Sequence, residues 1–163
     1  MTRVDETKLG LRLPPVSQIG FVVSDVDRMV ENYMSICGLG PWTVYEFAPD
    51  HYWFMEEPAE VRLKMGKCVL GDIELVLAQP LEGRSLHQEF LETHGDGVHS
   101  LTFNTLDYDQ MCDDFVRAGF APVMRVDTHV ETYGGQLKAC YFDTQRICGT
   151  LLEIRWASWL REP

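Results

Sequence analysis

Hydrophobic and polar positions along this chain predict short β-strands, with an amphipathic helix after the first of them. Residues 16–23 form an apolar, β-branched run that is typical of a strand. Asp25 is a favourable N-cap residue for a helix over residues 26–37, and Gly38 is a natural helix stop. Alternation and composition then predict three further strands, at residues 42–47, 61–65 and 68–77. The first half is therefore predicted to fold as a βαβββ unit.

The second half of the chain repeats this order of elements. Phe103 and Asp107 match Phe21 and Asp25 at a constant spacing, and a closing Ile-Glu-Leu in the first half matches a closing Leu-Glu-Ile in the second. The predicted elements are a strand at residues 98–105, a helix at 108–118, and strands near 123–130, 136–142 and 150–156. Such a repeat indicates two copies of one structural unit.

Each half alone is small for a stable core, so we expect the two halves to fold together as one domain over residues 16–158. The predicted parts are an N-terminal arm at residues 1–15, a first module at 16–84, a linker with a short helix at 85–97, and a second module at 98–158. The expected fold class is α+β. The two βαβββ modules would form a pseudo-twofold, cup-shaped mixed β-sheet with the helices outside.

Side-chain alternation predicts which strand residues line the cup, because successive strand residues point to opposite faces. In the first strand, the apolar residues Ile19, Phe21 and Val23 would face the helices. The same parity assigns to the cup Gln18, Glu74, Ser100, Thr102, Asn104, Glu153 and Arg155. Either glutamate alone fits an exposed sheet face equally well. Their recurrence at matching ends of the repeat favours the cup, where Gln18, Glu74, Ser100 and Glu153 are predicted to converge.

Composition narrows the classes of partner. The chain has 163 residues, 45% of them hydrophobic, and a formal net charge of −11, which opposes binding to nucleic acid or to an anionic membrane surface. It has no apolar run long enough to span a bilayer and no signal-like start, so a cytoplasmic location is expected. The five cysteines show no paired metal-binding spacing, which favours reduced thiols.

The chain resembles the vicinal oxygen chelate superfamily, which includes glyoxalase I, bleomycin-resistance proteins and extradiol dioxygenases. The resemblance is carried by the repeat, the βαβββ order and the closing glutamates, and it covers residues 16–157. Within that superfamily the chain is most similar to methylmalonyl-CoA epimerases, through residues 73–81, 90–99 and 149–153. A homodimer that binds a small-molecule substrate is expected from this resemblance.

The resemblance also implies a metal site, whose ligands map onto Gln18, Glu74, Ser100 and Glu153. The family's two histidines are missing from these positions, and an all-oxygen set disfavours Zn²⁺, Co²⁺ or Fe²⁺. His99 lies next to the Ser100 position, but its strand parity points it away from the cup unless a β-bulge intervenes. His99 is thus either structural or a displaced ligand. Two interpretations stay open: the protein binds a divalent metal, or its metal site is degenerate or absent. No organic cofactor is indicated by the sequence.

Proton transfer is the chemistry that the remaining residues could perform. If Glu74 and Glu153 approach each other without a cation, the pKa of the pair should rise and make one of them a general acid or base. A loose match to the epimerases adds Glu46 as a third candidate. Donors to a substrate oxygen would be Gln18, Ser100, Thr102, Asn104 and Arg155. Trp53 belongs to an aromatic stretch that forms either a wall over the substrate or ordinary core.

The first hypothesis is therefore an isomerase, epimerase or lyase that acts on a small oxygenated metabolite, with an acyl-CoA as one candidate. The alternative is a metal-free protein that sequesters a small molecule, of the bleomycin-resistance type. A ring-cleaving dioxygenase ranks third, because it would need the two absent histidines.

Overall fold

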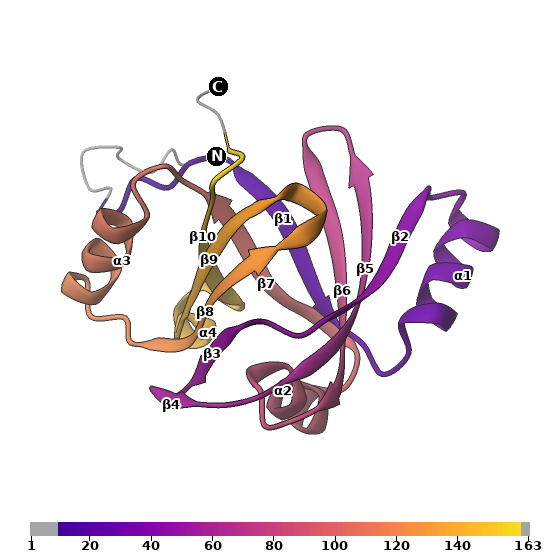
Figure 1. Ribbon diagram of the computed structural model, residues 1–163, viewed down its shortest axis with the longest axis horizontal. Helices are drawn as coiled ribbons and strands as arrows, with labels where there is room; N and C mark the ends of the chain where they lie inside the picture. Colours follow the sequence, from indigo (N-terminus) through magenta and orange to yellow (C-terminus); the bar gives the residue numbers. More distant parts are fainter. Residues whose placement is uncertain (1–9, 161–163) are drawn as a thin grey trace, which may run out of the picture.

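The computed structural model describes residues 10–160, which form a curled, mixed β-sheet of ten strands (Figure 1). The strands lie in the order β2-β5-β6-β1-β7-β10-β9-β8-β3-β4. Their bounds are β1 Val16–Val22, β2 Trp42–Phe47, β3 His51–Phe54, β4 Glu57–Pro58, β5 Arg62–Leu70, β6 Ile73–Glu82, β7 Gly97–Asn104, β8 Pro122–Val130, β9 Gly135–Phe142 and β10 Leu151–Ala157. The helices are α1 Val26–Cys37, α2 Leu86–His94, α3 Tyr108–Arg117 and α4 Gln145–Cys148, with a short 3-10 helix at Glu131–Tyr133.

The order of strands is the same on both sides of the central pair. β1 and β7 run antiparallel to each other, and each has the closing strand of its own module as a parallel neighbour, β6 and β10 respectively. β5 and β9 follow outward, and then β2 and β8. This arrangement confirms the predicted α+β cup built from two equivalent units.

Helices α1 and α3 lie outside the sheet at opposite ends of the molecule (Figure 1). α1 begins as predicted, with the Asp25 side chain accepting a hydrogen bond from the Arg28 backbone N–H at 3.0 Å, and it ends at Gly38, where φ is 66°. α3 contributes the fully buried Phe115, whose ring stacks on Phe142 of β9 at a centroid distance of 4.4 Å. Apolar packing therefore holds a helix of each module against the outer face.

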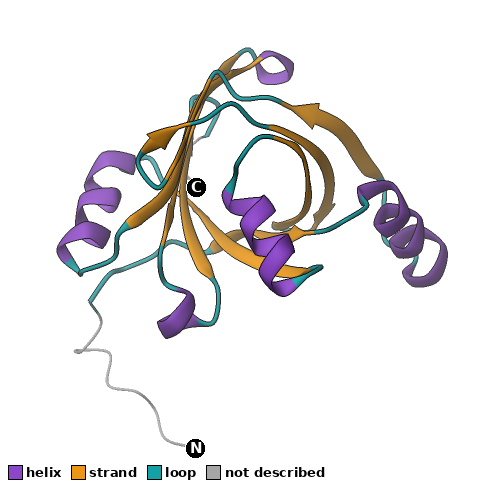
Figure 2. Ribbon diagram, turned by 90° about the horizontal axis from the view of Figure 1, so that it is seen from below, coloured by secondary structure: helices purple, strands orange, loops and turns teal. Residues whose placement is uncertain are grey.

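Helix α2 lies across one end of the curled sheet (Figure 2). Ser85 caps it by accepting a hydrogen bond from the Gln88 backbone N–H at 3.1 Å. Leu86 packs into a buried cluster with residues of β3, β9 and β10, including Tyr52, Tyr141 and Leu151. The linker helix predicted between the modules is present, and it fills one end of the cup.

The strand boundaries in the first module differ from the prediction. β5 runs without a break through Gly66, and the turn to β6 falls at Gly71 and Asp72. Gly66 lies in the middle of β5 and faces α1. A Cβ there would lie only 3.1 Å from Val26 Cγ1, so the glycine permits the helix to approach the strand.

The hairpin of β3 and β4 was not predicted. β3 pairs with β8, so a segment of the first module adds a strand to the sheet of the second. Of the predicted arm at residues 1–15, residues 1–9 lie outside the described part, while Leu11 and Leu13 pack against the cluster under α3. Within residues 10–160, the helices are too short or too polar to cross a membrane.

Candidate active site

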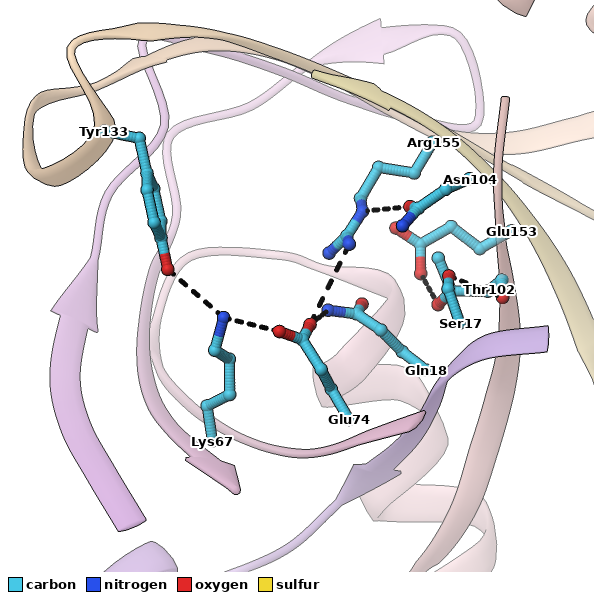
Figure 3. Close-up of polar contacts among 9 residues, drawn as sticks. All are labelled: Ser17, Gln18, Lys67, Glu74, Thr102, Asn104, Tyr133, Glu153 and Arg155. Carbon is cyan, nitrogen blue, oxygen red and sulfur yellow. Dashed lines mark hydrogen bonds and ion pairs between the residues drawn. The ribbon is translucent and has the colours of Figure 1, made fainter. Parts of the chain in front are cut away.

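Four polar side chains lie in one row across neighbouring strands of the cup. Gln18 on β1 is in register with Glu74 on β6 and with Thr102 on β7, and Thr102 is in register with Glu153 on β10. Side chains of aligned strand neighbours leave the same face of the sheet side by side. Figure 3 shows this row on the inner face, with Arg155 reaching over it.

Glu74 is held as a carboxylate by the groups around it. Lys67 Nζ lies 2.7 Å from its Oε1, Gln18 Nε2 donates a hydrogen bond to its Oε2, and Arg155 Nη2 lies 3.8 Å away (Figure 3). Desolvation alone would raise the pKa of Glu74, but the hydrogen bonds from Lys67 and Gln18 and the two positive charges outweigh it and lower the pKa. Glu74 is therefore ionised at neutral pH.

The pKa of Glu153 is shifted in the opposite direction to that of Glu74. Glu153 is 5% exposed, and it accepts a hydrogen bond from Thr102 Oγ1, with the Tyr141 hydroxyl also within reach. Burial raises its pKa, and the charge of Arg155 and these hydrogen bonds offset that rise only in part. Glu153 therefore holds a proton at higher pH than an ordinary glutamate does.

The expected carboxylate pair with a shared proton is not what the structure shows. Each glutamate has its own partners, which are Lys67 and Gln18 at Glu74 and Thr102 at Glu153. Arg155 stands near both and lowers the pKa of both. The two pKa values move apart because one carboxylate is surrounded by cations and the other by low-dielectric protein.

Three of the four residues predicted to converge line one small cavity of about 30 Å³. Gln18, Ser100 and Glu153 face it together with Thr102, whereas Glu74 does not line it and lies on the far side of Gln18. Gly20 leaves room for Ser100, because a Cβ there would lie 2.4 Å from Ser100 Oγ. A cavity of this size accommodates one or two water molecules.

Asn104 is bound to the cation above the row. Its Oδ1 accepts a hydrogen bond from Arg155 Nε at 2.8 Å, which fixes the direction of the guanidinium (Figure 3). The parity predicted for Asn104 and Arg155 thus brings both to the inner face. A ligand-binding role for either side chain stays a prediction.

His99 corrects the parity argument. The register of β1 against β7 passes from Gly20 opposite Ser100 to Phe21 opposite Val98, so His99 is an extra residue in a β-bulge. The bulge turns its ring inward, where it lines the small cavity and packs against His87 at a centroid distance of 5.1 Å. Parity counting predicted the outer face because it assumed an unbroken ladder.

The His87 and His99 rings are buried, and neither His87 Nδ1 nor His99 Nε2 has a hydrogen-bond partner within residues 10–160. Burial lowers the pKa of His87 to about 4 and lowers the pKa of His99 as well. Both rings are therefore neutral in the folded protein near pH 5, while the unfolded chain, with histidine pKa values near 6.5, takes up protons.

We expect the free energy of unfolding to fall as the pH drops from about 6.5 towards 4, because the unfolded state then binds more protons than the folded state. Changing His87 to Phe should reduce this fall by about 1–2 kcal/mol at pH 5. Urea unfolding of wild type and variant at pH 7 and pH 5 measures it. His51→Phe, at an exposed site, is the matched control. An unchanged pH dependence in His87→Phe would contradict the assignment.

Glu46 points away from the cup. It lies on β2 opposite Lys64, on the face that carries α1, and its carboxylate pairs with Arg62 at 3.0 Å. Its strand parity is that of Trp42, which packs on Tyr33 of α1. The structure therefore places Glu46 outside the cup, which contradicts its predicted role as a catalytic base. The match to the epimerases at this strand was loose, and a shift of one residue in such an alignment moves a side chain to the opposite face of the sheet.

Trp53 also lies apart from the polar row. It faces a groove of about 490 Å³ between α3 and strands β8 and β9, with the Arg125 guanidinium 5.7 Å from its ring centre. Its neighbours Tyr52 and Phe54 on β3 belong to the buried core. In β3, Tyr52 and Phe54 are therefore core residues and Trp53 lies on the outer surface. Trp53 does not cover the row of polar side chains in the cup.

Three residues at the inner face were not predicted from the sequence: Lys67, Tyr133 and Tyr141. Lys67 was assigned to a break between two strands. With β5 continuous through Gly66, its side chain alternates with Lys64 and enters the cup, so an unbroken strand would have revealed it. Tyr133 comes from the turn between β8 and β9, and its Oη accepts a hydrogen bond from Lys67 Nζ at 3.2 Å. A contact from a turn has no periodic signal in the sequence.

The residues at the implied metal position do not suit a divalent cation. Both oxygens of Glu74 are engaged by Lys67 and Gln18, and Arg155 adds a second positive charge. Within residues 10–160, no three His, Cys, Asp or Glu side chains are grouped so that they could hold a metal ion. A divalent ion bound to Glu74 would face repulsion from two fixed cations.

Comparisons with known proteins agree with this architecture. The family model described as the Glyoxalase/Bleomycin resistance protein/Dioxygenase superfamily matches residues 17–141. No curated protein sequence matches the chain.

Similar solved structures include methylmalonyl-CoA epimerases at low sequence identity. The enzyme from Mycobacterium tuberculosis is 21% identical, with a TM-score of 0.61 and coverage of 88% of each chain. An epimerase in complex with methylmalonyl-CoA and NH₄⁺ is 22% identical, with a TM-score of 0.64, covering 93% of this chain and 100% of that one. A Streptomyces coelicolor variant in complex with 2-nitronate-propionyl-CoA is 22% identical, with a TM-score of 0.62 and the same coverage. At these identities the likeness shows the fold.

Proposed function

Since the chain belongs to the glyoxalase/bleomycin resistance protein/dioxygenase superfamily, we propose that it is an isomerase or epimerase that moves a proton at the carbon next to a carbonyl group. The observation that supports this most is the pair of glutamates in one row whose pKa values are shifted in opposite directions. Two carboxyl groups with separated pKa values are a common basis for acid and base roles.

Glu153 is the proposed proton-transfer group. A carboxyl whose pKa is raised towards neutral pH is a stronger base when ionised and a useful acid when protonated. In the proposed step, Glu153 takes the proton from the substrate carbon, either directly or through a water in the adjoining cavity. The electron pair of the C–H bond moves to the carbonyl oxygen and forms an enolate, and return of the proton completes the exchange.

Glu74 has a different proposed role. Its low pKa makes it a weak base, but its charge orients Lys67 and Arg155 at the inner face. Positive groups that are oriented before the reaction stabilise an enolate oxygen as its charge develops. The reaction would then proceed without a divalent metal, because protein cations supply the positive charge.

A second candidate function, sequestration of a small molecule, is favoured by two features. The enclosed space beside Glu153 is only about 30 Å³, and both oxygens of Glu74 are already engaged. A protein that only binds would need no accessible acid or base. The expected homodimer belongs to either function and stays a prediction.

Hydrogen exchange in D₂O separates the two functions. The protein is incubated with propionyl-CoA, malonyl-CoA and methylmalonyl-CoA in the presence of EDTA, and deuterium at the carbon next to the thioester is followed by mass spectrometry. We expect incorporation above the enzyme-free rate for at least one thioester. Tight binding of a thioester without any incorporation would instead support sequestration.

A further inference from the structure

We propose that Cys112 of α3 and Cys140 of β9 form a dithiol site that reacts with small disulfides and closes reversibly into a Cys112–Cys140 disulfide bond. Both residues line the groove of about 490 Å³ between α3 and the outer face of the sheet. The row of polar side chains lies on the inner face, so the dithiol site is separate from it and does not depend on the proposed function. The ligand class is a low-molecular-weight disulfide.

The packing of α3 on β9 brings the two cysteines together. Phe115 stacks on Phe142 at a ring-centroid distance of 4.4 Å, which is one contact between the helix and the strand. Cys112 precedes Phe115 by about one helical turn, and Cys140 shares the strand face of Phe142. Cys140 belongs to the buried cluster under α3, and Cys112 packs against that cluster. The two thiols therefore lie in the same helix–sheet contact, within hydrogen-bonding reach of each other.

The two thiols differ in exposure, which gives them different roles. Cys112 is partly exposed at the wall of the groove, whereas Cys140 is 2% exposed. A reagent that enters the groove therefore meets Cys112 first, and Cys140 is reached by the neighbouring sulfur. An accessible thiol with a second thiol beside it is the arrangement in which the first is attacked and the second resolves the adduct.

The surroundings favour ionisation of the accessible thiol. A hydrogen bond from Cys140 lowers the pKa of Cys112, and one from Tyr108 adds to this effect, against burial and the charges of Asp109 and Asp113. The same contact between the thiols, together with burial, raises the pKa of Cys140. Since the thiolate is the nucleophile in disulfide exchange, the reaction begins at Cys112.

The exchange takes two steps. The Cys112 thiolate attacks one sulfur of the small disulfide, forms a mixed disulfide and expels one small thiolate. Cys140 then loses its proton, attacks Cys112 Sγ and expels the second small thiolate. The two protein thiols are oxidised, the small disulfide is reduced to two thiols, and the protons of the protein thiols end on these products.

Cystamine is the probe, because Asp109 and Asp113 lie beside Cys112 at the groove and favour a cationic disulfide. The reduced, folded protein is incubated with cystamine. Samples are blocked with N-ethylmaleimide at intervals, and the intact mass is measured. We expect a cysteamine adduct on Cys112 that then disappears, leaving a protein lighter than the reduced form by two hydrogen atoms.

Tryptic peptides identify the linked cysteines. Cys112, Cys140 and Cys148 fall on separate peptides, because Arg or Lys precedes and ends each segment. The peptide at residues 85–117 should become linked to the peptide at 139–146. An adduct on Cys112 that persists in wild type without this link would overturn the proposal, as would modification of Cys148 while Cys112 stays unmodified.

Variants separate the roles of the two thiols. Cys140→Ala should keep the adduct on Cys112 and lose the link, and Cys112→Ala should lose both. Cys148→Ala is the matched control, because Cys148 is exposed and does not line the groove. It should form the Cys112–Cys140 link at the wild-type rate. A link to Cys140 that survives in Cys112→Ala but is lost in Cys148→Ala would contradict the pairing.

Unfolding the wild type in urea tests whether the fold selects the pair. Loop-closure entropy in an unfolded chain favours the shorter loop between Cys140 and Cys148 over the longer one between Cys112 and Cys140. The Cys112–Cys140 link should therefore dominate in the folded protein and decrease in urea, while the Cys140–Cys148 link increases. If the Cys140–Cys148 link dominates in the folded protein as well, the groove does not hold a dithiol site.

Discussion

Replacing Glu153 with Gln is expected to reduce the rate of substrate hydrogen exchange by about 10²- to 10⁴-fold, the range typical of a lost general acid or base. Gln has nearly the same shape and can still accept the hydrogen bond from Thr102 Oγ1. It cannot take up or release a proton in the required range. Deuterium incorporation into the most active thioester, measured at saturating concentration, gives the rate.

A matched control makes this result specific. Glu46→Gln changes a glutamate on the outer face and should leave the exchange rate within about twofold of wild type, because Glu46 contacts Arg62 and not the cup. If the two variants lose activity to the same degree, Glu153 is not the proton-transfer group. A normal rate in Glu153→Gln would equally reject the assignment.

The stability of Glu153→Gln provides a check on folding. The raised pKa of Glu153 means that the folded state binds more protons than the unfolded state above about pH 4.5, so wild-type stability falls as the pH rises through the folded pKa. The variant lacks this loss. Relative to wild type, its free energy of unfolding should therefore improve between pH 5 and pH 8, which separates a catalytic defect from misfolding.

Changing Phe115 to Ala is expected to lower the free energy of unfolding by about 3–5 kcal/mol. The side chain is fully buried, and it stacks on Phe142 in the cluster that also contains Leu152 and Ile154. These last two residues flank Glu153 on β10, so the packing of α3 supports the strand that positions the proposed acid. Urea unfolding followed by Trp fluorescence measures the loss.

Val116 is the control on the same helix. Its side chain is 54% exposed, so Val116→Ala should change the free energy of unfolding by less than about 0.5 kcal/mol. If Phe115→Ala costs no more than Val116→Ala, α3 does not stabilise the sheet in the way described. A loss in both variants of the same large size would point to α3 as a whole and not to the buried ring.

Patterns that are local in sequence determined much of this protein. The repeat of apolar runs, the cap at Asp25 and the alternation around Gln18 and Thr102 were sufficient for the two modules and for most of the inner face. Backbone geometry is the reason, because a strand presents alternate residues to one face whatever it packs against.

Only the tertiary structure showed which further side chains enter the cup and how the two glutamates are protonated. The bulge at His99 turned one side chain inward, the uninterrupted β5 brought Lys67 to Glu74, and the turn before β9 added Tyr133. It also gave the two glutamates opposite pKa shifts, since one lies beside two cations and the other is buried. Register breaks and charge environments depend on residues far apart in the chain, so the alternation of a single strand can place a carboxyl group but cannot set its protonation.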